Sequence, residues 1–188
     1  MVTLARPSIL HSVAIPAQQE AIRRIEELDL EPIVYKLTVS EHGEPPKMTL
    51  EEADRNVVLY RQFLILNALY PDKSIVPTRD LDEVWHTHIL DTEKYDADCG
   101  YLFGRKLHHF PYLGLRGPED VERWQAAFAE TRQLFMQHFG VVLTSNSAAC
   151  GESCGGSLCD GGSCDSSSCD ASVNPAQRLR PRPNRTNA

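Results

Sequence analysis

The sequence predicts a mainly α-helical fold: a compact multi-helix single domain followed by a disordered tail rich in glycine, serine and cysteine. A chain of 188 residues with 41% hydrophobic residues can build one substantial core. Apolar residues recur at helical spacing through the body of the chain. Near Ser145 small and polar residues replace them, and such a composition buries too little apolar surface to order the chain. We therefore expect an N-terminal extension over residues 1–14, a helical domain over 15–144, a cysteine-rich tail over 145–170 and a basic disordered end over 171–188.

The first two expected helices cover residues 16–28 and 49–70. In the first, Ile22 and Ile25 share one face with charged residues between them. The second begins at Thr49-Leu-Glu-Glu52, which has the spacing of a capping box, and ends before the next proline. Its apolar positions cover a wide arc, so we expect this helix to be central to the core.

Three further helices are expected over residues 80–90, 92–103 and 118–140. Asp80 and Glu83 repeat the capping spacing at the start of the first. Gly104 suits a left-handed cap at the end of the second. Pro118 suits the first turn of the third, which carries a long apolar face.

Charge and hydropathy restrict the partners and the location. The formal charge is −7, which gives no general attraction to nucleic acid or to anionic membranes. The best apolar run is interrupted by Arg61 and Gln62, and the first residues do not resemble a secretory signal. We expect a cytoplasmic protein with no membrane or nucleic-acid partner, and a protein partner stays open. The arginine-rich stretch 178–185 suits solubility or docking to an acidic partner at least as well as an anionic ligand.

The segment Asp80 to His109 holds four of the seven histidines. On a helix, His86 and His88 are separated by about 200 degrees and point apart, whereas on a strand they would share a face. We expect a helix, with Trp85 and His88 buried and His86 more accessible.

Several side chains near His86 can bind a metal. Tyr95, Asp98, Cys99 and Leu102 form one stripe of the next helix, which can face one of the two histidines if the helices form a hairpin. Zinc, iron or copper would suit such nitrogen, oxygen and sulfur donors. The candidate ligands are His86, His88, Asp98, Cys99, His108 and His109, supported by Asp82, Trp85 and Tyr95. The alternative is structural: these residues belong to the core and hold loops, with no ion.

The run from Asp82 to His109 resembles the WHTH...Y..DC...G...H segment of the glycine-rich domain-containing protein-like family. The resemblance extends more loosely over residues 49–140, and the glycine- and cysteine-rich tail is similar to the tails of such proteins. It implies a compact helical domain of largely undefined biochemical activity. It supplies no catalytic residues.

The tail contains five cysteines at near-regular spacing: Cys150, Cys154, Cys159, Cys164 and Cys169. The spacing differs from the C-x2-C pairs of a zinc knuckle, so it indicates loose chelation of soft ions by several thiolates. A solvated low-complexity tail is an equal alternative, and a segment that is modified after synthesis is a third.

These observations favour a binding or interaction protein that holds zinc or another transition metal. The rival hypothesis is a metal-dependent enzyme centred on the WHTH/DC segment. An enzyme requires an open cleft with a vacant ligand position, and an interaction protein does not. Whether the protein is an enzyme stays open at this point.

Overall fold

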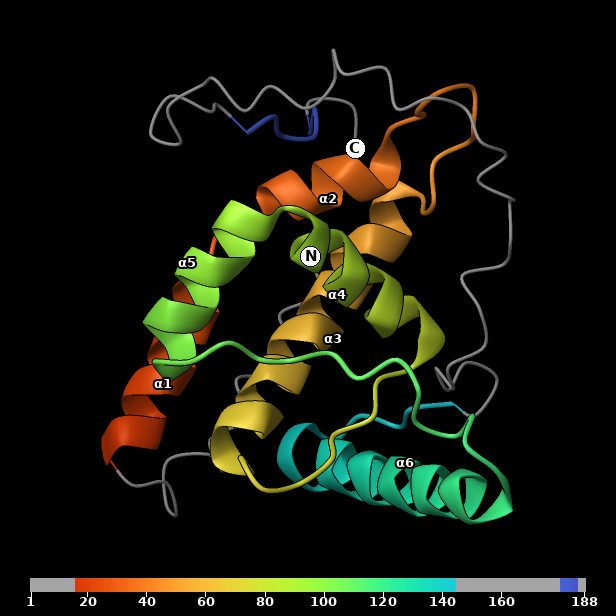
Figure 1. Cartoon of the computed structure of the whole chain (residues 1–188). Coiled ribbons are helices and arrows are strands. Elements are labelled where there is room, and N and C mark those ends of the chain that lie inside the picture. Colours follow the sequence, from red (N-terminus) through yellow and green to blue (C-terminus); the bar gives the residue numbers. More distant parts are fainter. Residues whose placement is uncertain (1–15, 145–179, 186–188) are drawn as a thin grey trace.

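The computed structural model describes residues 16–144 and 180–185. Its described part contains six α-helices and no strand, which confirms the mainly α-helical prediction. The helices are α1 Pro16–Glu27, α2 Glu31–Thr38, α3 Leu50–Leu69, α4 Arg79–Leu90, α5 Thr92–Phe103 and α6 Pro118–Phe139 (Figure 1). The N-terminal extension, the cysteine-rich tail and most of the basic end lie outside the described residues. Within the described residues, no helix is both long enough and apolar enough to cross a membrane.

Helix α3 is the centre of the fold, as its apolar pattern predicts. It packs against α1, α2, α4 and α6, and the other helices surround it in Figure 1. Tyr60, Phe63 and Leu66 are fully buried. Burial of side chains of this size contributes roughly 1.5–3 kcal/mol each. The predicted capping box is present: the Thr49 hydroxyl accepts from the Glu52 N–H, and the Glu52 carboxylate accepts from the Thr49 N–H.

Helix α2 was not among the predicted elements. It has only eight residues, and Pro32 in its first turn is the local signal for its start. Its apolar residues Ile33, Val34 and Leu37 are buried against α3 and α4. Arg61 fixes the turn before it by donating to the carbonyl oxygens of Ile25 and Leu28, both at 2.6 Å. Long-range contacts therefore stabilise a helix too short to form alone.

Helices α4 and α5 form the hairpin that holds most of the predicted site residues. The N-cap of α4 is Thr78, whose hydroxyl accepts from the Leu81 N–H, whereas the sequence had suggested Asp80. The helix therefore begins before Asp80, which lies in its first turn. At the end of α5, Gly104 adopts a left-handed conformation with φ of 66°, as predicted.

The loop between α5 and α6 is held by a buried carboxylate. Asp120 is fully buried and accepts from the Gly114 N–H at 2.7 Å and from Arg116 Nη2 at 2.7 Å. Gly114 has a φ of 89°, and a Cβ there would lie 3.4 Å from the Trp124 ring. Arg116 in turn lies over the Phe110 ring, 4.9 Å from its centroid. Asp120 thus fixes the loop that carries Phe110.

The Asp120 contacts predict a specific acid sensitivity. The Arg116 hydrogen bond is the largest cause that lowers the Asp120 pKa, from 3.8 to about 2. Because the folded-state pKa is the lower one, ionised Asp120 stabilises the fold above about pH 4, and this contribution is lost between about pH 4 and pH 2. Asp120→Asn is expected to lower the urea midpoint at pH 6, with the difference shrinking towards pH 2. A difference that stays constant over this range would contradict the assignment.

Candidate metal centre

Helix α4 places Asp82 and His86 on one face and His88 on another. Asp82 and His86 are four residues apart, so their side chains lie one turn above each other. The side chain of His88 is 2% exposed, whereas that of His86 is 31% exposed. Trp85 is also buried. The predicted separation of the two histidines is therefore confirmed.

His109 reaches the same face from the segment that follows α5. Leu107, two residues before His109, is buried, and its carbonyl oxygen accepts a hydrogen bond from the Tyr95 hydroxyl. The His109 ring lies against Trp85, with the ring centroids 4.6 Å apart. These contacts fix His109 opposite Asp82 and His86, although it is 23 residues from His86 in sequence.

Asp82, His86 and His109 bring their donor groups close together: the two carboxylate oxygens of Asp82 and Nε2 of each histidine. His109 Nε2 lies 3.0 Å from Asp82 Oδ1 and 3.1 Å from His86 Nε2. The third separation, from His86 Nε2 to Asp82 Oδ2, is 3.6 Å. This is the only group of three or more such donors close enough to share a metal ion within the residues that the structure describes. We refer to these three residues as the His/Asp triad.

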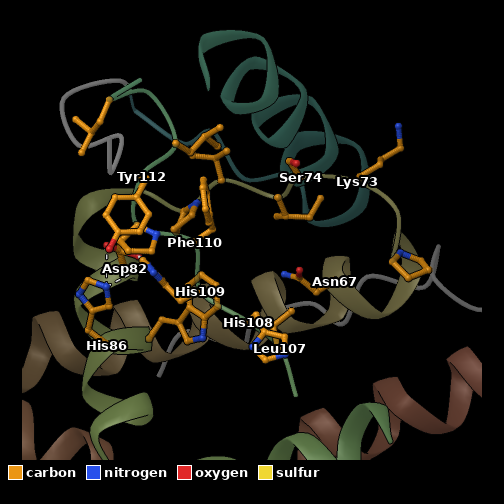
Figure 2. A pocket seen from close by; sticks show the side chains of 18 of the residues that line it. Asn67, Lys73, Ser74, Asp82, His86, Leu107, His108, His109, Phe110 and Tyr112 are labelled. Carbon is orange, nitrogen blue, oxygen red and sulfur yellow. Dashed lines mark hydrogen bonds and ion pairs between the residues drawn. The ribbon is translucent and has the colours of Figure 1, made fainter. Parts of the chain in front are cut away.

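The His/Asp triad lines an open pocket with a volume of about 610 Å³. Figure 2 shows the triad together at one end of this pocket, with Lys73 at the other. Trp85, Phe110 and Tyr112 supply aromatic surface, while Arg105 and His108 add polar groups. The pocket therefore gives a ligand access to the donor groups of the His/Asp triad.

His88 and Asp98 belong to a separate buried network. The Tyr60 hydroxyl donates to His88 Nδ1 at 2.9 Å, and His88 Nε2 donates to Asp98 Oδ2 at 2.9 Å. Lys94 Nζ completes the network at 2.8 Å from the same carboxylate oxygen. Burial alone would raise the Asp98 pKa, but the hydrogen bonds from His88 and Lys94 outweigh it and lower that pKa. Both nitrogens of His88 are therefore occupied by protein partners.

Cys99 also lies apart from the His/Asp triad. Its side chain is buried with Tyr95 and Leu102 on the predicted stripe of α5, which faces His88. Burial raises the Cys99 pKa, which disfavours the thiolate that a metal requires. Tyr95, on the same stripe, accepts a hydrogen bond from Trp85 Nε1 at 2.9 Å and so also has a structural role.

The structure thus places two of the six predicted core ligands, His86 and His109, in one possible metal-binding group, and adds Asp82, which the sequence placed in a supporting role. His108 is exposed and lines the pocket outside the triad. The five tail cysteines lie outside the described residues. The four-residue spacing that made Asp82 a supporting residue of His86 is also the signal that could have identified it as a ligand. Tyr60 and Lys94, which complete the His88 network, were not anticipated as its partners.

The fold and the site define the class of protein: a helical domain with two imidazoles and a carboxylate close together at an open pocket. The chain belongs to the UCP032817-like family, whose model matches residues 21–129 and so includes the whole His/Asp triad. Over 95 residues the chain is 33% identical to glycine-rich domain-containing protein 1 of Arabidopsis thaliana. That match covers 48% of this chain and only 11% of the plant protein. Both findings support a relationship to the proteins that the WHTH segment resembles. No solved structure shows a significant match.

Proposed function

We propose that this protein binds one transition-metal ion through Asp82, His86 and His109. The observation that carries the proposal is the convergence of three donor residues from two separate segments, whose nearest donor atoms are 3.0, 3.1 and 3.6 Å apart in pairs. The pocket beside them provides the remaining coordination positions.

The separations fit the geometry of a bound ion. For metal–ligand bonds of about 2.1 Å, neighbouring donors lie about 3.0 Å apart in an octahedron and about 3.4 Å apart in a tetrahedron. The two separations that involve His109 Nε2, 3.0 Å to Asp82 Oδ1 and 3.1 Å to His86 Nε2, match the octahedral spacing. The 3.6 Å separation joins His86 Nε2 to the other carboxylate oxygen, Asp82 Oδ2, so binding through one oxygen also requires a small rotation of the Asp82 carboxylate. Rotamer adjustments of this size cost little, so the site is close to its binding conformation.

The donor types select the class of ion. Two imidazole nitrogens and one carboxylate suit zinc or iron(II), whereas calcium and magnesium prefer sites built from oxygen alone. The supporting contact between Trp85 and the His109 ring restricts its rotation. Such fixation of a ligand ring raises metal affinity because less freedom is lost on binding.

A metal-dependent enzyme is the second candidate function, and the open pocket favours it. Catalytic zinc and iron sites keep three protein ligands and leave a position for water or substrate. His108 and Arg105 line the same pocket and can contact a bound molecule. Three further parts of the proposal rest on the sequence alone. The tail cysteines chelate soft ions, the protein has a protein partner, and it is located in the cytoplasm.

Metal titration tests the site once the tail thiols are removed as competitors. In a full-length chain with Cys150, Cys154, Cys159, Cys164 and Cys169 replaced by serine, one equivalent of zinc is expected to bind. His86→Ala, His109→Ala and Asp82→Ala in this background are each expected to weaken zinc binding by about 100-fold or more, because each removes one of three ligands. His108→Ala is the matched control and should bind zinc normally. Equal affinity in all four variants would refute the site.

Cobalt(II) distinguishes the two candidate functions. If the bound ion has an open position, azide is expected to change the visible spectrum of the cobalt-loaded chain. A spectrum that azide leaves unchanged would indicate a closed site and argue against the enzyme.

A further inference from the structure

The described residues 180–185 lie against the helical body far from them in sequence. Their sequence, Arg-Pro-Arg-Pro-Asn-Arg, forms part of the basic end that was expected to be disordered. Figure 1 shows this short blue segment beside α2. Its three arginines all contact carboxylates of the body. These carboxylates form an acidic face made of Asp29, Glu31, Asp54 and Asp91.

Each arginine forms a two-pronged contact with its carboxylate. Arg180 donates through Nε and Nη2 to the two oxygens of Asp91, and Arg182 donates through Nη1 and Nη2 to those of Asp29. Such paired bonds fix orientation as well as charge, because the planar guanidinium matches the planar carboxylate.

Arg185 joins two helices at the far end of the segment. It contacts Glu31 of α2 at 3.0 and 3.1 Å and Asp54 of α3 at 2.9 Å through two nitrogens. Asp29 and Glu31 are close in sequence, but Asp54 and Asp91 come from later parts of the chain, so the folded body is needed to assemble the acidic face.

The prolines prepare the segment for this contact. A proline disfavours the helical conformation in the residue before it, so Pro181 and Pro183 restrict Arg180 and Arg182 and lower the entropy lost on docking. Pro183 and Asn184 also line a hollow of about 590 Å³ beside Tyr35 and Met48.

We propose that the acidic face is a binding site for an arginine- and proline-containing peptide and that residues 180–185 of the same chain occupy it. The arginines are thereby committed to carboxylates and not to phosphates.

The strength needed for this occupancy is small. A ligand on the same chain experiences an effective concentration on the order of millimolar, so a separate peptide needs a Kd of only about 1 mM or below for the linked segment to be mostly bound. Exposed ion pairs are individually weak, so the affinity must come from Arg180, Arg182 and Arg185 acting together.

Peptide binding to a vacated face is the direct test. In full-length chain carrying Arg180→Gln, Arg182→Gln and Arg185→Gln, a synthetic peptide of residues 178–188 is expected to bind at 50 mM salt. Adding Asp29→Asn and Asp54→Asn should weaken it at least 10-fold, as should 500 mM salt. Glu51→Gln removes another exposed carboxylate of α3, which pairs with Arg55, and should change nothing. The proposal fails if a peptide with glutamine in place of the three arginines binds equally well.

Cleavage of the unsubstituted chain tests occupancy within one molecule. Trypsin must take up the Arg185 side chain to release residues 186–188, so Asp29→Asn with Asp54→Asn is expected to speed this release about 5-fold or more. Glu51→Gln should not alter the rate. The chain should remain monomeric by light scattering. A dimer that dissociates on Asp54→Asn would show that a second copy supplies the segment and would overturn occupancy in the same chain, as would an unchanged cleavage rate.

Discussion

Replacing His88 with alanine is expected to lower the free energy of unfolding by about 3–5 kcal/mol. The His88 side chain is almost fully buried, and its two nitrogens bond Tyr60 and Asp98. Alanine would leave the buried Tyr60 hydroxyl without its acceptor, remove one partner of a mostly buried carboxylate and create a cavity. Chemical denaturation followed by circular dichroism measures the loss.

Three comparisons identify the cause of that loss. His108→Ala changes an exposed histidine and should stay within about 0.5 kcal/mol. Tyr60→Phe added to His88→Ala removes the orphaned hydroxyl and should recover about 1–2 kcal/mol. Zinc affinity of the folded His88→Ala chain should be unchanged, because His88 lies outside the His/Asp triad. A loss below about 1 kcal/mol would mean that the buried network does not stabilise the fold.

The helices could be predicted from sequence where local chemistry determines them. Thr49 and Glu52 cap α3 through side chains three residues apart, and Gly104 ends α5 because its backbone must be left-handed. The start of α4 was placed late because Asp80 has the same capping chemistry as Thr78, and local pattern alone does not rank them. Helix α2 was missed because its stability comes from contacts with α3 and α4.

Some features of the candidate site could likewise be predicted from the sequence, and others depend on the tertiary fold. The helical period separates His86 from His88 and groups Asp82 with His86, so these relationships were accessible from sequence. The choice of His109 over its neighbour was not, because it depends on the buried Leu107 and on the Trp85 ring. The division of the histidines between the His/Asp triad and a buried network likewise depends on Tyr60, which lies on another helix.

Trp85 joins the core to the His/Asp triad. One side of its ring system packs against Phe63 of α3 at a centroid distance of 5.0 Å, and it also contacts the His109 ring at 4.6 Å. Its Nε1 donates to the Tyr95 hydroxyl, which donates to the Leu107 carbonyl just before the histidine pair. Trp85 is therefore a positioning residue: it holds His109 without itself offering a metal ligand.

Trp85→Ala is consequently expected to have two effects. Loss of a large buried side chain should cost about 3–5 kcal/mol of unfolding free energy. In the background lacking tail cysteines, zinc affinity should also fall about 10- to 100-fold, which is typical for groups that orient a metal ligand. Competition with a zinc-sensitive dye measures this affinity at a temperature where the variant is folded.

Two further variants separate positioning from general stability. Trp85→Phe keeps an aromatic ring against His109 and should restore most of the zinc affinity, although it lacks the hydrogen bond to Tyr95. Phe135→Ala removes an equally buried ring on α6 that does not line the pocket, so it should cost similar stability and leave zinc affinity unchanged. If Phe135→Ala weakened zinc binding as much as Trp85→Ala, the effect would come from loss of stability, and the contact between Trp85 and His109 would have no role in orienting the ligand.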